Sequence, residues 1–240
     1  MLPNLKINPE ELPERVIVCG DPKRAAKIAA LLEDQRQLGE NREYHSYAGK
    51  WHGIEVAVVS HGVGAPGAAV CFEELAKGGA KTVIRVGTAG SYQQEVPPGS
   101  LVISTGAVRT DGLTSQLVPN GFPAIADRHV AAALAEAAVQ ENHEGLPVAE
   151  GLTLTIDVFY NGVLEFPHTL YKKAGVLAVE MENSALYVIA ALRGMKAGAI
   201  LAIDGYADAD LLESYNPHTD FTAKAIEAEA RIALAAIIRV

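Results

Sequence analysis

The sequence predicts a single α/β domain built on a largely parallel or mixed β-sheet. Short, β-branched apolar runs alternate with helix-forming stretches from one end of the chain to the other. No linker-like change of composition, repeat or low-complexity tract interrupts the 240 residues, so we expect one domain over residues 1–240. Polar residues follow several of the apolar runs directly, and in α/β folds ligands bind beyond the carboxyl ends of the strands.

The strands are predicted from apolar, β-branched runs, and the helices from apolar periodicity with capping residues. The expected strands are 15–19, 43–50, 54–60, 82–86, 100–104, 151–156, 176–179 and 197–203. The expected helices are 22–32, 67–77, 127–142, 167–174, 183–192 and 217–238.

Local signals fix several boundaries between these elements. Asp21 suits the N-cap of the first helix and Pro22 its first position. A turn at His52-Gly53 joins two of the strands. The strand at 82–86 is expected to end in a tight turn at Gly87–Gly90, and 109–123 is expected to be a long polar loop.

Composition excludes several classes of function. The net charge of −9 argues against nucleic acid or an anionic membrane as the main partner. No apolar run is long enough to span a bilayer, and the first residues lack the apolar core of a secretory signal. Cys19 and Cys71, both in apolar surroundings, indicate reduced core residues of a cytoplasmic protein. The histidines show no zinc-like spacing, so we expect no metal.

Arg85 is the first candidate functional residue, because it interrupts the apolar run TVIRV. A buried guanidinium stays charged and needs an anionic partner. That partner is either a ligand held at the following glycines or an internal carboxylate, for which Glu180 and Glu182 are available.

Three further residues each have a functional and an ordinary interpretation. Arg24 lies in the first turn of a helix, where the helix dipole disfavours cations, so it either faces an anion or bonds Asp21 while Lys23 is solvated. Arg42 is a ligand or a surface arginine. His61 is more often a hydrogen-bonded loop histidine than a ligand.

Taken together, these residues predict phosphorolysis of a nucleoside. Arginines, Thr88 and the turn at Gly20 would form a small oxyanion site, with phosphate the obvious occupant. Glu182 could accept two hydrogen bonds from a diol. Asp204, at the end of an apolar strand, could have a raised pKa and donate a proton, or could instead cap a helix. Tyr160 and Met181 offer apolar faces.

The chain resembles the nucleoside phosphorylase-I family, which contains hexameric purine nucleoside phosphorylases, uridine phosphorylases and related nucleosidases. The matching stretches occur in family order and cover nearly the whole chain: VIVCGDPKRAAKIA, NREY, VVSHGVGAPGAAVCFEEL, VIRVGTAGS, DVFY, VEMENSAL and AIDGY. The likeness is greatest to the protozoan-type purine enzymes. It implies a mixed, partly barrel-like central sheet flanked by helices, with inorganic phosphate as co-substrate and no cofactor.

The resemblance also implies a role for each matching residue. Phosphate would be held by Gly20, Arg24, Arg85 and Thr88, with Arg42 reaching in from a neighbouring subunit of a hexamer built as a trimer of dimers. Asp204 would be the acid facing purine N7. The nucleoside would be bound by Ala89, Gly90, Tyr160, Val179, Glu180, Met181 and Glu182, with Glu182 on the ribose hydroxyls.

Two departures from the family pattern concern the nucleoside site. Asn4 stands where relatives place a histidine that crosses the dimer to the ribose 5′-hydroxyl. The loop 205–217 is shorter than in the protozoan type and holds no tryptophan, which concerns the lid over the base.

Rival functions remain on the same scaffold. A nucleosidase would use water and would not need three arginines at one site. Uridine phosphorylases typically carry a Gln-x-Arg pair after Phe-Tyr, whereas here NGVLEFP follows, which favours purine. A non-catalytic nucleoside-binding module would be expected to have lost Asp204 or an arginine. A dinucleotide-binding module would need the G-x-G-x-x-G pattern, which the first glycine turn lacks.

Overall fold

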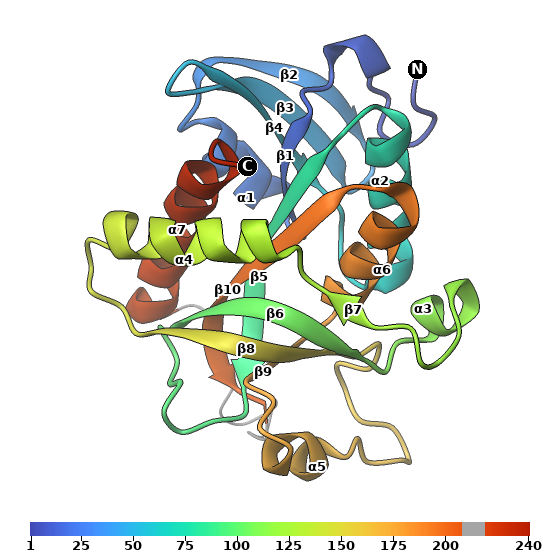
Figure 1. Cartoon of the computed structure of the whole chain (residues 1–240), viewed down its shortest axis with the longest axis vertical. Helices are drawn as coiled ribbons and strands as arrows, with labels where there is room; N and C mark the ends of the chain where they lie inside the picture. The colour runs from blue at the N-terminus through green and yellow to red at the C-terminus, as the bar shows by residue number, and fades with distance from the viewer. Residues whose placement is uncertain (208–218) are drawn as a thin grey trace.

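The computed structural model describes residues 1–207 and 219–240 (Figure 1). Its strands are β1 (Arg15–Cys19), β2 (Glu33–Asn41), β3 (Tyr44–Trp51), β4 (Ile54–Ser60), β5 (Thr82–Ser91), β6 (Leu101–Arg109), β7 (Ala124–Ile125), β8 (Val148–Thr155), β9 (Ala178–Glu180) and β10 (Lys196–Tyr206). Its helices are the 3₁₀ turn η1 (Pro9–Glu11) and α1 (Pro22–Ala29), α2 (Ala65–Lys77), α3 (Gly112–Leu117), α4 (Arg128–Glu141), α5 (His168–Lys173), α6 (Asn183–Arg193) and α7 (Asp220–Ile237).

The strands form one mixed, partly closed sheet. Its order is β10-β6-β8-β9-β5-β1-β4-β3-β2, and β10 also pairs with β5 in parallel. This second pairing of β10 closes β5, β9, β8, β6 and β10 into a ring, while β1, β4, β3 and β2 extend from β5 as an open sheet. The predicted α/β class and the partly barrel-like sheet are therefore confirmed.

Helices cover the sheet on two sides (Figure 1). Helices α2 and α6 pack together on one side, over the core that contains Phe72, Leu186 and Tyr187. Helices α1, α4 and α7 lie on the other side, over the core that contains Ile84 and Leu134. No helix in residues 1–207 or 219–240 is long and apolar enough to cross a bilayer.

Most predicted boundaries hold, because their local signals act as expected. Asp21 caps α1 by accepting a hydrogen bond from the backbone N–H of Lys23 at 3.0 Å. His52 and Gly53 both have positive φ, as the turn between β3 and β4 requires. The last helix begins at Asp220 with Thr219 as its N-cap, and residue 217 lies outside the described residues.

Several expectations were wrong. The strand predicted at 100–104 continues to Arg109, and the helix predicted at 22–32 ends at Ala29. The tight turn at Gly87–Gly90 does not form, because β5 continues to Ser91 with parallel pairing to β10. Strand β2 was missed, since its sequence EDQRQLGEN is exposed, pairs only with β3 and shows no apolar alternation. The polar loop at 109–123 contains the short helix α3, whose N-cap is Asp111.

Candidate active site

A gap in strand pairing beside β5 positions the site. On one side of β5, β1 pairs only as far as Arg85, and β9 begins to pair at Gly90. A cavity of about 620 Å³ lies at this gap, lined by Gly87, Thr88 and Ala89 of β5. The glycine-rich stretch thus borders a ligand-sized space as an extended strand instead of as a turn.

The predicted site residues converge on this cavity from several elements. Those that line it are Gly20, Arg24, Arg85, Thr88, Ala89, Gly90, Val179, Glu180, Met181, Glu182 and Asp204. They come from the turn after β1 and from α1, from β5, from β9 and the two residues that follow it, and from β10. The parallel strands β1, β5 and β10 bring distant residues to this part of the sheet, and β9, which is antiparallel to β5, adds its residues beside them.

Arg24 supplies a cation on the α1 side of the cavity. Its side chain is 17% exposed, and its Nη1 lies 3.5 Å from Oε1 of Glu229 on α7. Asp21 accepts instead from the backbone of Lys23, and Lys23 itself is exposed. The alternative in which Arg24 bonds Asp21 is therefore wrong, and its acidic partner comes from the far end of the chain.

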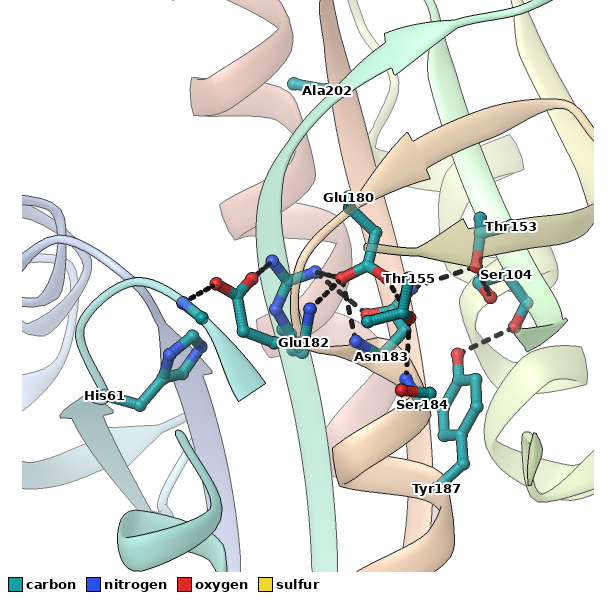
Figure 2. A network of polar contacts seen from close by, with 12 residues as sticks. His61, Ser104, Thr153, Thr155, Glu180, Glu182, Asn183, Ser184, Tyr187 and Ala202 are labelled. Atoms are coloured by element: carbon teal, nitrogen blue, oxygen red, sulfur yellow. Dashed lines mark hydrogen bonds and ion pairs between the residues drawn. The ribbon is translucent and has the colours of Figure 1, made fainter. Parts of the chain in front are cut away.

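Arg85 is buried and paired with two internal carboxylates. These are Glu180 and Glu182, which Figure 2 shows beside Asn183. The Nη1 of Arg85 lies 3.1 Å from Glu180 Oε2 and donates to Asn183 Oδ1 at 2.9 Å, while its Nη2 pairs with Glu182. Burial lowers the pKa of Arg85, but the two carboxylates outweigh it and leave the pKa raised. The interpretation with internal carboxylates is therefore confirmed, and the paired guanidinium also lines the cavity.

Glu180 and Glu182 have different surroundings. Glu180 Oε2 accepts from the backbone N–H groups of Glu182 and Asn183 at 2.6 and 2.7 Å, and Oε1 accepts from the Thr155 hydroxyl. Glu180 thereby holds the first turn of α6, and burial raises its pKa. Glu182 Oε1 accepts only from the backbone N–H of Gly64, at 2.6 Å, in the described part of the chain. A carboxylate can accept about four hydrogen bonds, so Glu182 keeps capacity for a ligand.

Asp204 lies within β10 as the extra residue of a β-bulge. The pairing of β10 with β5 shifts register between Ile203 and Gly205, and the intervening Asp204 lines the cavity. A bulge turns one side chain away from the regular alternation of the strand, and bulges are common beside active sites. The nearly buried carboxyl of Asp204 therefore faces the same space as Arg85 and Glu182.

The rest of the cavity wall is mainly apolar and was partly missed from the sequence. The additional lining residues include Glu43, Val63, Ile156, Phe159, His168 and Tyr206. His168, in the first turn of α5, exchanges a hydrogen bond of 2.7 Å between its Nδ1 and the buried Tyr92 hydroxyl. Phe159 could have been predicted as a site residue, because it stands beside Tyr160 in the motif DVFY, whereas no sequence pattern marked His168.

Three predicted residues do not line the cavity of this single chain. Asn4 donates from its backbone and side chain to Glu74, and the segment is held there. Arg42 is exposed, with φ of 54°, between β2 and β3. Tyr160 is 66% exposed, and its neighbour Phe159 lines the cavity instead.

His61 is confirmed as a hydrogen-bonded histidine just past the end of β4. Its Nδ1 lies 2.8 Å from the carbonyl oxygen of Gly62, and its Nε2 has no hydrogen-bond partner among the described residues. Burial lowers the pKa of His61 to about 4. Within residues 1–207 and 219–240 no cluster of histidine, cysteine and carboxylate side chains could hold a metal ion.

Comparisons with known proteins agree with this fold. A family model described as the phosphorylase superfamily matches residues 14–239. A purine nucleoside phosphorylase of Plasmodium falciparum is 40% identical over 207 residues, which are 85% of this chain and 83% of that protein. A uridine phosphorylase of Thermococcus kodakarensis is 36% identical over 212 residues, 83% of this chain and 76% of that protein. The crystal structure of Toxoplasma gondii purine nucleoside phosphorylase with immucillin-H superposes with a TM-score of 0.94 at 33% identity, covering 100% of this chain and 96% of that one.

Proposed function

Since the chain belongs to the phosphorylase superfamily, a family of pentosyltransferases, we propose that it is a purine nucleoside phosphorylase. It would cleave the N-glycosidic bond of purine (deoxy)ribonucleosides with inorganic phosphate, releasing the free base and (deoxy)ribose 1-phosphate. The main observation in support of this proposal is that one cavity is lined by Arg24, Arg85, Glu182 and Asp204. That cavity offers cations for phosphate, a carboxylate for a diol and an acid for a leaving base.

Phosphate would bind against Gly20, Arg24, Arg85 and Thr88. The two guanidiniums supply charge-assisted hydrogen bonds, and the Thr88 hydroxyl supplies another donor. The resemblance to the hexameric relatives implies that Arg42, which is exposed in the single chain, would complete this site from a neighbouring subunit. The assembly proposed is a hexamer of three dimers.

The nucleoside would lie between Glu182 and Asp204. Glu182 has acceptor capacity left for the ribose hydroxyls, while Ala89, Gly90, Val179 and Met181 border the sugar and base. Asn4 and Tyr160 would reach the nucleoside across the subunit boundary or after a change of the exposed segment.

The reaction would begin with cleavage of the glycosidic bond, which gives a ribosyl oxocarbenium-like transition state. Asp204 would stabilise the departing purine at N7 by hydrogen bonding or protonation. Phosphate beneath C1′ would stabilise the cation and then capture it. No cofactor takes part in these steps.

The sequence that follows Phe159 favours a purine over uracil as the base. The residues after Phe159 and Tyr160 contain no Gln-x-Arg pair. The described residues that line the cavity include Ile156, Phe159 and His168. Both purine and uridine phosphorylases occur among the similar proteins, so the choice of base rests on these residues.

Incubation with a nucleoside panel, with and without phosphate, tests the function. Inosine or guanosine should yield free base and ribose 1-phosphate only when phosphate is present. Equal release of base with free ribose in phosphate-free buffer would show a nucleosidase. Cleavage of uridine alone would show a uridine phosphorylase, and binding without turnover would show a non-catalytic binder.

A further inference from the structure

Glu229 is a buried carboxyl that no step of the proposed reaction uses. It lies on α7 with a side chain that is 0% exposed, and it does not line the cavity. Its Oε2 accepts from the backbone N–H of Ala202 at 3.0 Å. Its Oε1 has no hydrogen bond in the described part of the chain and lies 3.5 Å from Nη1 of Arg24. A buried carboxyl oxygen without a hydrogen bond is costly and calls for an explanation.

The contacts of Glu229 join three elements that carry the site. Arg24 belongs to α1, and Ala202 lies on β10 two residues before Asp204. The backbone N–H of Gly87, which precedes Thr88 on β5, also interacts with the carboxyl. Glu229 therefore contacts the parts of the chain that would hold phosphate, although it does not itself line the cavity.

We propose that Glu229 is a positioning residue for the phosphate site, which orients Arg24 and, when ionised, competes with phosphate for that guanidinium. This inference rests on the proposed function, because it takes phosphate as the ligand of Arg24. A neutral carboxyl leaves the full charge of Arg24 to phosphate. An ionised carboxyl neutralises part of that charge and repels the bound dianion.

The groups that face Glu229 determine the pH range in which its carboxyl ionises. Arg24 of α1 and Arg85 of β5 favour the ionised form, as do the N–H groups of Gly87 and Ala202. The thiol of Cys19 on β1 stays neutral, because burial raises its pKa to about 12.

Helix α4 also packs against α7, and it presents apolar side chains such as Val130 and Leu134. Burial outweighs the favourable groups and raises the pKa of Glu229 to about 8. The proton would therefore leave in the mildly alkaline range, where phosphate is already largely a dianion.

Binding of inorganic phosphate, measured by titration calorimetry between pH 6.5 and 9, tests the proposal without turnover. Glu229→Gln keeps an acceptor for the Ala202 N–H but cannot ionise. Wild type and variant should bind phosphate alike at pH 6.5, and wild type should bind about tenfold more weakly than the variant at pH 9. Since the ionisation of phosphate itself is the same for both proteins, the ratio of the two Kd values reports Glu229.

Glu227→Gln is the matched control. Glu227 lies on the same helix, loses the same charge and pairs with Arg231 at the surface, so its Kd ratio to wild type should not change with pH. A Kd ratio for Glu229→Gln that is also constant from pH 6.5 to 9 would overturn the proposal and leave Glu229 a purely structural residue.

A second measurement needs no variant. Because bound phosphate raises the pKa of a neighbouring carboxyl, wild type should take up protons when it binds phosphate at pH 8, seen by calorimetry in buffers of different ionisation enthalpy. No uptake would overturn the proposal even if Glu229→Gln failed to fold. If phosphate bound with this pH dependence but no nucleoside were cleaved, the proposed function would be contradicted while the role of Glu229 would stand.

Discussion

Arg85 and Glu182 form an ion pair at the cavity, although they are 97 positions apart in the chain. Arg85 comes from the middle of β5, and Glu182 directly precedes α6. In the proposed function the first binds phosphate and the second binds ribose. The two half-sites therefore share one charge pair, and a change in either residue should affect the binding of both substrates.

Loss of the Glu180 charge should destabilise the fold strongly. Glu180→Gln removes one of the anions that pair with buried Arg85 and replaces an acceptor of two backbone N–H groups. A buried charge left without any partner costs about 3–5 kcal/mol. Because Arg85 keeps its pair with Glu182, we expect the free energy of unfolding in urea to fall by less than this amount, but by more than in an exposed pair.

The control for this experiment is Glu73→Gln. Glu73 pairs with Arg193 at 2.8 Å, but both side chains are partly exposed. Exposed pairs contribute about 0–1 kcal/mol, so this variant should unfold almost like wild type. Equal losses in the two variants would mean that burial does not govern the Arg85 pair.

Asp204 should matter more for purine than for pyrimidine nucleosides. When the glycosidic bond of a purine nucleoside breaks, the negative charge on the leaving base can be neutralised at N7. A pyrimidine has no N7. Asp204→Asn keeps a hydrogen-bond donor and Asp204→Ala keeps none, so kcat for inosine should fall in both, more in the alanine variant, by about 10²–10⁴-fold. Phosphate binding should change little. If folded variants lost inosine and uridine cleavage equally, Asp204 would be positioning the substrate instead.

Arg42 should act across a subunit boundary, because it is exposed in the single chain and does not line its own cavity. Arg42→Ala and Asp204→Asn should each be nearly inactive. Mixing them under subunit exchange should restore part of the activity, since one site of a mixed dimer regains both residues. Mass spectrometry would confirm the exchange, and confirmed exchange without recovery would place Arg42 outside the neighbouring site.

The fold should lose stability in acid partly through His61. Burial holds the pKa of His61 at about 4 in the folded chain, below its ordinary value of 6.5. The unfolded chain therefore binds a proton that the folded chain does not, and stability falls as the pH drops from about 6.5 to 4. His61→Gln cannot titrate, so its free energy of unfolding should depend less on pH over this range. An unchanged slope in chemical denaturation would exclude His61 as the cause.

Much of the site was predictable because it depends on local sequence. Apolar runs mark the strands, and the polar residues that follow or interrupt them, such as Arg24, Arg85 and Glu182, are brought to one edge by the α/β architecture itself. The same reasoning failed for β2 and for Gly87–Gly90. An exposed edge strand has no apolar pattern, and the pairing of β5 with β10 joins segments more than a hundred residues apart.

Glu227 and Glu229 show what only the tertiary structure decided. The sequence determines that two carboxylates lie two positions apart on the last helix, and therefore point to nearly opposite sides of it. The helical period puts Glu229 on the face of Ile226 and Ile232, whereas Glu227 stands beside Lys224, so the local pattern favours Glu229 as the inward residue. The packing of α7 against β10 and β5 leaves Glu227 70% exposed and buries Glu229 completely beside Arg24. The local pattern does not say which groups the buried Glu229 meets. Its contacts with Arg24 and with the backbone N–H of Ala202 depend on how the helix packs against segments far away in the chain.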